Sequence, residues 1–306
     1  MRFKKLLRNF LKPFENGIVV YIFLKFLIFF IQIIPVFLFE RLIIIMGNFA
    51  FYTMKGHRKL ALKNMDIAFG NKYTKEEKIK ICKQMFIEIM SFLEIFQLYK
   101  FTADQLIANT EIVGEDILKE IMKEKKGIIA ISPHMGNFPF ALLILNKKGY
   151  PVNVIIQRSV NVYSDMDLRK LRKKFKIPSI SKKDLKEAIN ESIKWIKNKG
   201  ILCIYLDQHS SSGIECEFFG KKVYVPTGAA VFARKYKTKV IGFYTIRKGF
   251  MKHKIFIEGP YEIKITKNIS QDIKENTQFF IKRVQEWVEK YPEHWSSWLN
   301  IGRFPD

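Results

Sequence analysis

The chain has 306 residues, 48% of them hydrophobic, and its 53 Lys and Arg against 29 Asp and Glu give a formal net charge of +24. This length suits one full-sized hydrophobic core plus an appended segment, and the charge points to anionic partners. The three cysteines, Cys82, Cys203 and Cys216, form no C-x-x-C or Cys/His pattern, which argues against a disulfide framework or a zinc site and favours reduced thiols.

An apolar segment lies close to the N-terminus. Residues 17–39 span 23 positions with one charge, Lys25, and at ~1.5 Å per residue they could cross a ~30 Å hydrocarbon layer. Pro35 interrupts the segment, residues 42–52 continue it, and no small-residue cleavage site follows. The flanking cations are Arg2, Lys4, Lys5, Arg8 and Lys12 before it, and Lys55, Arg58, Lys59 and Lys63 after it.

The charges on both flanks bear on how this segment meets a membrane. Because the positive-inside rule places both flanks on the cytoplasmic side, an in-plane or re-entrant hairpin is favoured over a single span. A buried core helix is the third alternative. We therefore expect residues 1–55 to form a hydrophobic membrane anchor and residues 56–306 to form a separate domain.

The remainder of the chain carries helical and strand patterns in alternation. Residues 74–96 open with Thr74 and Glu77 in capping-box spacing and predict an amphipathic helix. Strands are predicted at 127–132, 152–157, 201–206, 239–247 and 254–259, and helices at 138–149, 167–175, 183–200, 227–237 and 274–290. This order predicts an α/β fold, with a central mixed sheet flanked by helices on both faces.

Polar residues follow two of the predicted strands. His134 comes after strand 127–132, and Asp207 and Gln208 come after strand 201–206. Ligands of open α/β sheets bind beyond the carboxyl ends of the strands, so these residues are expected at one functional edge. The competing interpretations are a structural histidine at 134 and a turn-forming aspartate at 207.

Several sequence blocks carry a resemblance to a known family. The blocks are HRKLALKNMDIAF (57–69), HMGNFP (134–139), DQHSSSG (207–213), FFGKKVYVPTG (218–228) and PEHW (292–295). In this order they resemble the late lipid A acyltransferases, the lauroyl and myristoyl transferases of the lysophospholipid-acyltransferase-like superfamily. The resemblance begins near His57 and continues to the C-terminus.

The resemblance implies a membrane-bound O-acyltransferase with a glycerolipid-acyltransferase-like fold, its acyltransferase domain being residues 56–306. Such an enzyme moves a fatty acyl chain from a thioester of acyl carrier protein or coenzyme A to a hydroxyl of a lipid A precursor or similar glycolipid. It uses neither a metal nor another cofactor, and it works at the cytoplasmic face of the cell inner membrane. The expected partners are the acyl donor, the membrane glycolipid and an anionic membrane surface. Nucleic acid is not expected, because no RNP, zinc-finger or helix-turn-helix pattern is present.

The family's general base and its orienting acid correspond to His134 and position 139. A hydroxyl needs a base to take its proton as it attacks the thioester, and a neutral imidazole suits this at cell pH. Position 139 is Pro139, which has no carboxylate. Asp207 is the best replacement at the strand edge, with Asp165 and Asp167 next. The alternative is a catalytically impaired relative that binds lipid or acyl donor.

Further residues are candidates for the site. The family's active-site arginine corresponds to Arg169, a catalytic candidate, or to Arg158, a substrate-binding one. Gly136, Asn137, Gln208, Thr227 and Gly228 are the other substrate-binding candidates; Thr227 and Gly228 could cradle an anion at a helix start, or serve only as a cap. The run RKLRKKFK (169–176) is either a solvated basic face or a docking surface for phosphate headgroups or the acidic carrier protein.

Overall fold

The structure is a computed structural model that describes residues 25–26, 28–156, 170, 172–173, 175–182 and 184–300. The helices are α3 (Val36–Thr53), α4 (Lys55–Phe69), α5 (Lys75–Met90), η1 (Ser91–Lys100), α6 (Ala103–Ala108), α7 (Glu115–Lys123), α8 (Phe138–Lys147), α10 (Leu185–Lys197), α11 (Gly228–Tyr236), α12 (Ile269–Lys290), η2 (Pro292–His294) and η3 (Ser296–Leu299). The strands are β1 (Thr110–Val113), β2 (Ile128–Ser132), β3 (Val152–Ile156), β4 (Ile180–Ser181), β5 (Ile201–Tyr205), β6 (Ile214–Phe218), β7 (Lys221–Val225), β8 (Lys239–Gly249) and β9 (Lys252–Tyr261).

A central sheet organises the described part of the chain. Its seven strands follow the order β1-β9-β8-β2-β5-β3-β4, and the neighbours run parallel except for the antiparallel pair β8–β9. The five predicted strands are β2, β3, β5, β8 and β9. This confirms the predicted α/β fold with a mixed sheet.

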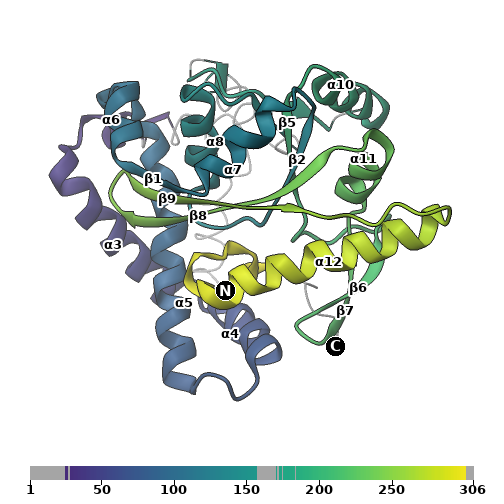
Figure 1. Cartoon of the computed structure of the whole chain (residues 1–306). Coiled ribbons are helices and arrows are strands. Elements are labelled where there is room, and N and C mark those ends of the chain that lie inside the picture. Colours follow the sequence, from purple (N-terminus) through teal and green to yellow (C-terminus); the bar gives the residue numbers. More distant parts are fainter. Residues whose placement is uncertain are drawn as a thin grey trace.

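Helices cover both faces of this sheet. Side chains of a buried strand alternate between the two faces, so each face forms its own core with the helices that cover it. In β2, Ile128 and Ala130 lie in one core cluster together with side chains of α7 and α8. Ile129 and Ile131 lie in a second cluster with side chains of α10, α11 and α12. Figure 1 shows α7 and α8 on one side of β8 and β9, with α12 running along the other side. The prediction of helices on both faces is confirmed.

The hairpin β6–β7 is a separate two-stranded sheet outside the predicted strands. Its turn is Phe219-Gly220, and both residues have positive φ, +52° and +69°. Two successive residues of that kind form the turn whose twist matches a tight hairpin. The hairpin packs against α12, where the Gln278 side chain exchanges two hydrogen bonds with the backbone of Glu217.

The predicted amphipathic helix 74–96 forms in two parts. Thr74 and Glu77 make the reciprocal hydrogen bonds of a capping box at the start of α5. The α-helix ends at Met90, and the chain continues as the 3₁₀ helix η1. At the junction, the Ser91 hydroxyl donates to Glu88 O at 2.6 Å, a local bond that competes with regular helical pairing.

The apolar N-terminal segment breaks where Pro35 stands, between helical residues 28–33 and α3. Within the described ranges, α3 is the one helix whose length and apolar composition would allow it to cross a membrane. The boundary expected at residue 55 falls at the first residue of α4, and the division into an anchor and a domain stays a prediction. Part of the predicted helix 167–175 lies outside the described residues.

Candidate active site

Two neighbouring strands bring His134 and Asp207 together. β2 and β5 pair in parallel with Ser132 opposite Tyr205, so each polar residue stands two positions beyond its strand in matching register. His134 Nδ1 lies 2.7 Å from Asp207 Oδ1, and the His134 backbone N–H donates to Asp207 Oδ2 at 2.9 Å. The carboxylate therefore fixes both the ring and the backbone of His134.

Asp207 is fully buried, and its Oδ2 accepts two further hydrogen bonds besides the one from the His134 backbone. Its Oδ2 accepts from Trp295 Nε1 at 2.8 Å and from Ser297 Oγ at 2.9 Å. A buried carboxylate is tolerated where donors replace the water that it has lost. With the carboxylate as acceptor, the neutral ring of His134 places its proton on Nδ1 and leaves Nε2 as an acceptor.

The C-terminal segment closes around the loop that carries His134. Met135 forms a backbone bridge with Trp295, the Gly136 N–H donates to His294 O at 2.8 Å, and the Ser296 hydroxyl donates to His134 O at 3.0 Å. Gly136 has φ +55°, and a Cβ there would lie 2.4 Å from Thr245 O of β8. Only glycine fits this close passage without a shift of the backbone.

Aromatic rings flank the imidazole. The Tyr205 ring is tilted by 33° to it at 4.4 Å between centroids, and the Phe138 ring meets it edge-on at 5.1 Å. Phe92 of η1 packs in turn against Phe138 at 5.5 Å. The exposed Gln208 places its Nε2 3.3 Å from His134 Nε2. Two aromatic rings thus pack against the imidazole, and its Nε2 lies beside an exposed side chain.

The residues that follow His134 have structural contacts in the described structure. Asn137 is buried, and its Nδ2 donates to Ser91 O at 3.2 Å. Pro139 stands in the first turn of α8, where its missing N–H leaves no helical bond unmade. The Gly136 amide is already bonded to His294 O. The substrate contacts expected of Gly136, Asn137 and Gln208 stay predictions.

Four of the charged candidates fall outside the described residues: Arg158, Asp165, Asp167 and Arg169. Their expected roles stay predictions. Lys170 and Lys173, from the same basic run, are described and exposed.

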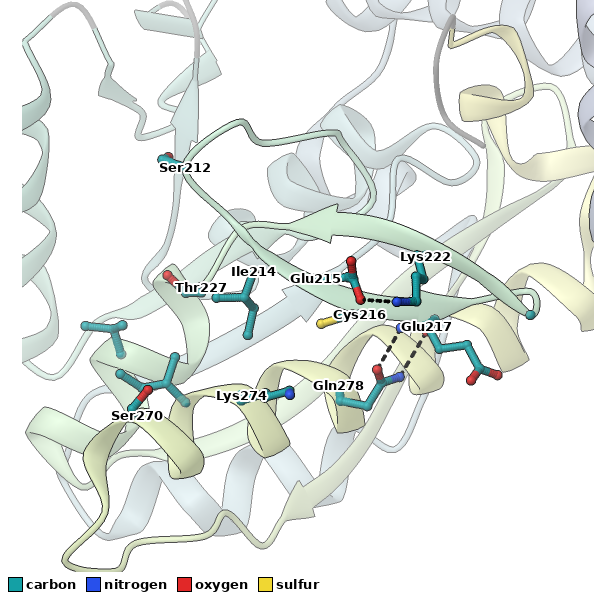
Figure 2. A pocket seen from close by; sticks show the side chains of 13 residues that line it. Ser212, Ile214, Glu215, Cys216, Glu217, Lys222, Thr227, Ser270, Lys274 and Gln278 are labelled. Carbon is teal, nitrogen blue, oxygen red and sulfur yellow. Dashed lines mark hydrogen bonds and ion pairs between the residues drawn. The ribbon is translucent and has the colours of Figure 1, made fainter. Parts of the chain in front are cut away.

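Thr227 and Gly228 stand at the start of α11. Thr227 precedes the helix without a side-chain capping bond and lines a pocket of about 810 Å³ between the β6–β7 hairpin and α12. Figure 2 shows the Glu215–Lys222 ion pair on the hairpin side of this pocket and Lys274 on α12. Neither His134 nor Asp207 lines the pocket, and anion binding at Thr227 and Gly228 stays a prediction.

Buried ionisable groups lie behind the loop. Burial raises the pKa of Glu88 to about 7 and lowers the pKa of His294 to about 3. Their nearest atoms, Glu88 Oε2 and His294 Nδ1, are 3.7 Å apart. Burial is the largest effect on both groups and favours the neutral form of each, although Arg247 partly offsets it at Glu88, so this contact is not a strong ion pair. Deeper in, Glu94 and Arg247 form an ion pair at 2.7 Å.

Trp295 and Ser297 are site residues that the sequence patterns do not predict. The matched block PEHW contained a signal for Trp295, because it places a tryptophan in a segment that matches the family. Ser297 carried no signal of its own. The block at 57–69 has a structural counterpart here: it forms α4, whose Asn64 Nδ2 donates to Trp298 O at 2.8 Å.

Among the described residues, no group of three or more His, Cys, Asp and Glu side chains is placed to hold a metal ion.

Comparison with known proteins identifies the family of this chain. No curated protein matches the chain. Residues 4–301 match the family model described as bacterial lipid A biosynthesis acyltransferase. Because the match spans nearly the whole chain, the protein belongs to the bacterial lipid A biosynthesis acyltransferase family.

Proposed function

We propose that the protein is a membrane-bound O-acyltransferase that moves a fatty acyl chain from a thioester to a hydroxyl of a lipid A precursor, with His134 as the general base. The observation that supports this proposal best is the contact of His134 Nδ1 with Asp207 Oδ1 at 2.7 Å. An imidazole whose Nδ1–H is held by a buried carboxylate has the tautomer and the orientation that a base needs.

In the proposed step, Nε2 of His134 takes the proton of the acceptor hydroxyl as the oxygen attacks the thioester carbonyl carbon. The new C–O bond forms, the C–S bond breaks, and the departing thiolate takes the proton back from the imidazolium. Asp207 stabilises the positive charge on the ring between these two proton transfers. Gln208, 3.3 Å from Nε2 through its amide nitrogen, would yield its place to the acceptor hydroxyl.

The same contact addresses the missing acid at position 139. Pro139 offers no carboxylate, which is what favours an impaired relative that only binds lipid or donor. Asp207 instead supplies a carboxylate to Nδ1 from the neighbouring strand. This contact supports an active His134–Asp207 dyad over an inactive site, because the carboxylate lies where an acid could orient the imidazole.

The proposed acyl transfer also implies the partners of the protein. The donor is an acyl thioester of acyl carrier protein or of coenzyme A, and the acceptor is a glycolipid held in the membrane. We propose the cytoplasmic face of the inner membrane as the location, supported by the apolar helix α3 and the cations Lys55, Lys59 and Lys63 in or beside α4. The net charge of +24 suits both an anionic bilayer surface and an acidic carrier protein.

The test is a double-mutant cycle on the full chain in detergent micelles, with a labelled acyl thioester and a lipid A precursor. His134→Ala and Asp207→Asn should each lower kcat by ~10³ or more, and the double variant should lose little beyond that, because residues that act as a unit are non-additive. The donor is presented once on carrier protein and once on coenzyme A.

His209→Ala is the matched control, since His209 is an exposed histidine two residues after Asp207. It should keep near wild-type turnover. Full activity in His134→Ala would refute the proposed base. Absence of transfer by the wild-type chain with every donor, together with retained glycolipid binding, would support the impaired relative instead.

A further inference from the structure

The helix α3 presents a broad exposed apolar face. Phe37 is 75% exposed, Ile45 62% and Phe49 68%. At 100° per residue these three positions fall within one arc of the helix. The helical residues before Pro35 add Phe26, Phe29 and Ile33, which are also exposed. A contiguous apolar surface of this kind marks a membrane or protein interaction site.

The opposite face of α3 packs along the protein over most of its length. Phe39, Ile43, Gly47, Ala50 and Phe51 are buried. Phe39 contacts Phe250, and Phe51 contacts Phe86 of α5, so the packing reaches from near one end of the helix to near the other. In the middle, a Cβ on Gly47 would lie 2.5 Å from Ile87 Cα, so the two helix backbones are in close contact.

Charged groups accompany this packed face. Glu40 of α3 lies 3.5 Å from Arg247 and accepts the N–H of Phe250 at 3.1 Å. On α5, Lys83 stands three residues before Phe86, which contacts α3, and its Nζ lies 5.5 Å from the ring of Tyr52 of α3. If α3 crossed a bilayer, α5 would have to enter the hydrocarbon with it, and ionised side chains there are strongly disfavoured. The contacts of α3 therefore oppose a spanning orientation.

Cations and tyrosines border the exposed face at both ends of α3. Near the C-terminal end, Lys83 Nζ lies 5.5 Å from the ring of the exposed Tyr52, and Lys55 is exposed beyond it. Near the N-terminal end, Lys100 Nζ donates to Ile34 O and lies 5.9 Å from the ring of the exposed Tyr99. Tyrosine and lysine together suit the headgroup level of an anionic bilayer.

Arg41 lies exposed on α3 itself, within the arc of the apolar side chains. In a helix parallel to the bilayer surface, its long side chain can extend to the headgroups while its methylenes stay in apolar surroundings. In a spanning helix it would stand about 8 Å along the axis from Val36, inside the hydrocarbon.

We propose that α3 lies flat in one leaflet of an anionic bilayer, with its Phe37–Phe49 face in the acyl chains and its other face on the protein, and does not cross the membrane. This inference rests on the membrane-bound state included in the proposed function and defines its geometry. The surface also lies near the candidate site. The helix η1 contacts α3, and its Ser91 O accepts from Asn137 in the loop after His134. A glycolipid acceptor in that leaflet would reach the dyad without leaving the membrane.

The experiment measures depth at three points along α3 in the full chain. Phe37→Cys, Ile45→Cys and Phe49→Cys are labelled singly with an environment-sensitive fluorophore and placed in vesicles of phosphatidylglycerol and phosphatidylethanolamine. Phospholipids brominated at defined acyl positions act as quenchers. A flat helix puts all three probes at similar depths, ~5–10 Å below the headgroups. A spanning helix would spread positions 37 and 49 over ~18 Å.

The controls separate this geometry from the enzymatic proposal. The native cysteines are buried and should label poorly, and Tyr224→Cys on β7 gives an exposed site that bromolipid should not quench. Shallow quenching at position 37, quenching near the bilayer midplane at position 45 and an intermediate depth at position 49 are the pattern of a spanning helix and would overturn the proposal. So would unquenched α3 probes in a chain that is dimeric in detergent, since a second copy would then cover the face. Neither readout depends on acyl transfer, so an inactive protein with a flat α3 would overturn only the proposed function.

Discussion

The indole N–H of Trp295 donates a hydrogen bond to Asp207 Oδ2 at 2.8 Å, and the Trp295 side chain is fully buried. Asp207 Oδ1, on the same carboxylate, is the atom in contact with His134 Nδ1. The orientation of the imidazole is therefore set by a segment that lies 88 residues further along the chain than Asp207. Trp295 acts on the proposed chemistry through Asp207, as a positioning residue.

Trp295→Phe should impair turnover more than substrate binding. The substitution keeps most of the aromatic packing and removes one donor from a buried carboxylate, which costs about 1–3 kcal/mol. We expect kcat to fall about tenfold or more, while KM for donor and acceptor changes little. Steady-state kinetics of the full chain in detergent measure this split.

Trp298→Phe is the matched control for that variant. Trp298 is equally buried, but its Nε1 donates to Pro292 O at 2.8 Å rather than to Asp207. It should lower the unfolding free energy by a similar amount with a smaller loss of kcat. Equal losses of kcat in both variants would show that Trp295 contributes only to folding.

Pro139→Glu should not raise activity. The carboxylate that the family places at this position would orient Nδ1, and Asp207 Oδ1 already lies 2.7 Å from that atom. Removing proline from the first turn of α8 should cost at most about 1 kcal/mol through the unfolded chain. Turnover of Pro139→Glu is compared with that of Pro139→Ala. A tenfold gain specific to glutamate would mean that Asp207 does not supply the missing function.

The central sheet was predictable because its strands are short buried runs separated by helical patterns, as with Ile128–Ser132 and Ile201–Tyr205. The edge strands were not. β1 has four residues and β4 has two, which are too few for an alternation of apolar and polar residues to be recognised. The hairpin β6–β7 does alternate buried and exposed residues. Its turn residues, Phe219 and Gly220, lack the usual asparagine or aspartate, and this weakened the signal.

The pairing of His134 with Asp207 could be anticipated because parallel neighbours bring the residues after them to one edge. The hydrogen bonds from Trp295 and Ser297 could not. They depend on how η2 and η3 fold back over the loop, and that is a tertiary contact with no local periodicity. The buried state of Glu94 was equally hidden, since a glutamate in a helical pattern ordinarily predicts a solvated face.

Charge reversal at Lys170, Arg172, Lys173 and Lys174 should weaken use of a carrier-protein donor. If this run docks an acidic protein, KM for acyl carrier protein substrates should rise about tenfold, and the effect should shrink in high salt as exposed charges are screened beyond ~10 Å. KM for acyl coenzyme A should change less. Kinetics with both donors at 50 and 500 mM salt provide the comparison.

Reversal of Lys119, Lys123, Lys125 and Lys126 provides a control with the same change in net charge. These exposed lysines belong to α7 and to the residues just before β2, at the amino end of the sheet, whereas His134 and Asp207 follow its carboxyl ends. Equal increases in KM after the two reversals would mean that net charge explains the effect and that residues 169–176 do not form a docking surface.

Glu88 should make the protein less stable as the pH rises. Its pKa is about 7 in the folded chain against an ordinary 4.5, so the folded state holds the proton more tightly than the unfolded state does. That contribution to stability is complete below pH 4.5 and is lost as the pH rises through about 7. His294 acts oppositely: with a folded pKa of about 3 against 6.5, its contribution is complete above pH 6.5 and is lost as the pH falls towards 3.

Glu88→Gln isolates the first effect, since glutamine keeps the size and can still pair with Gln84, whose Nε2 donates to Glu88 Oε1 at 2.8 Å. Between pH 5 and pH 8.5, the unfolding free energy of the variant should gain about 2–3 kcal/mol relative to wild type. Urea unfolding across this range measures the gain, and His294→Gln serves as the control, because its difference from wild type should develop on the acid side of pH 6.5. Parallel curves of unfolding free energy against pH for wild type and Glu88→Gln would contradict this prediction. They would mean that Glu88 has the same pKa in the folded and unfolded chains, because the charge of Arg247 offsets the effect of burial.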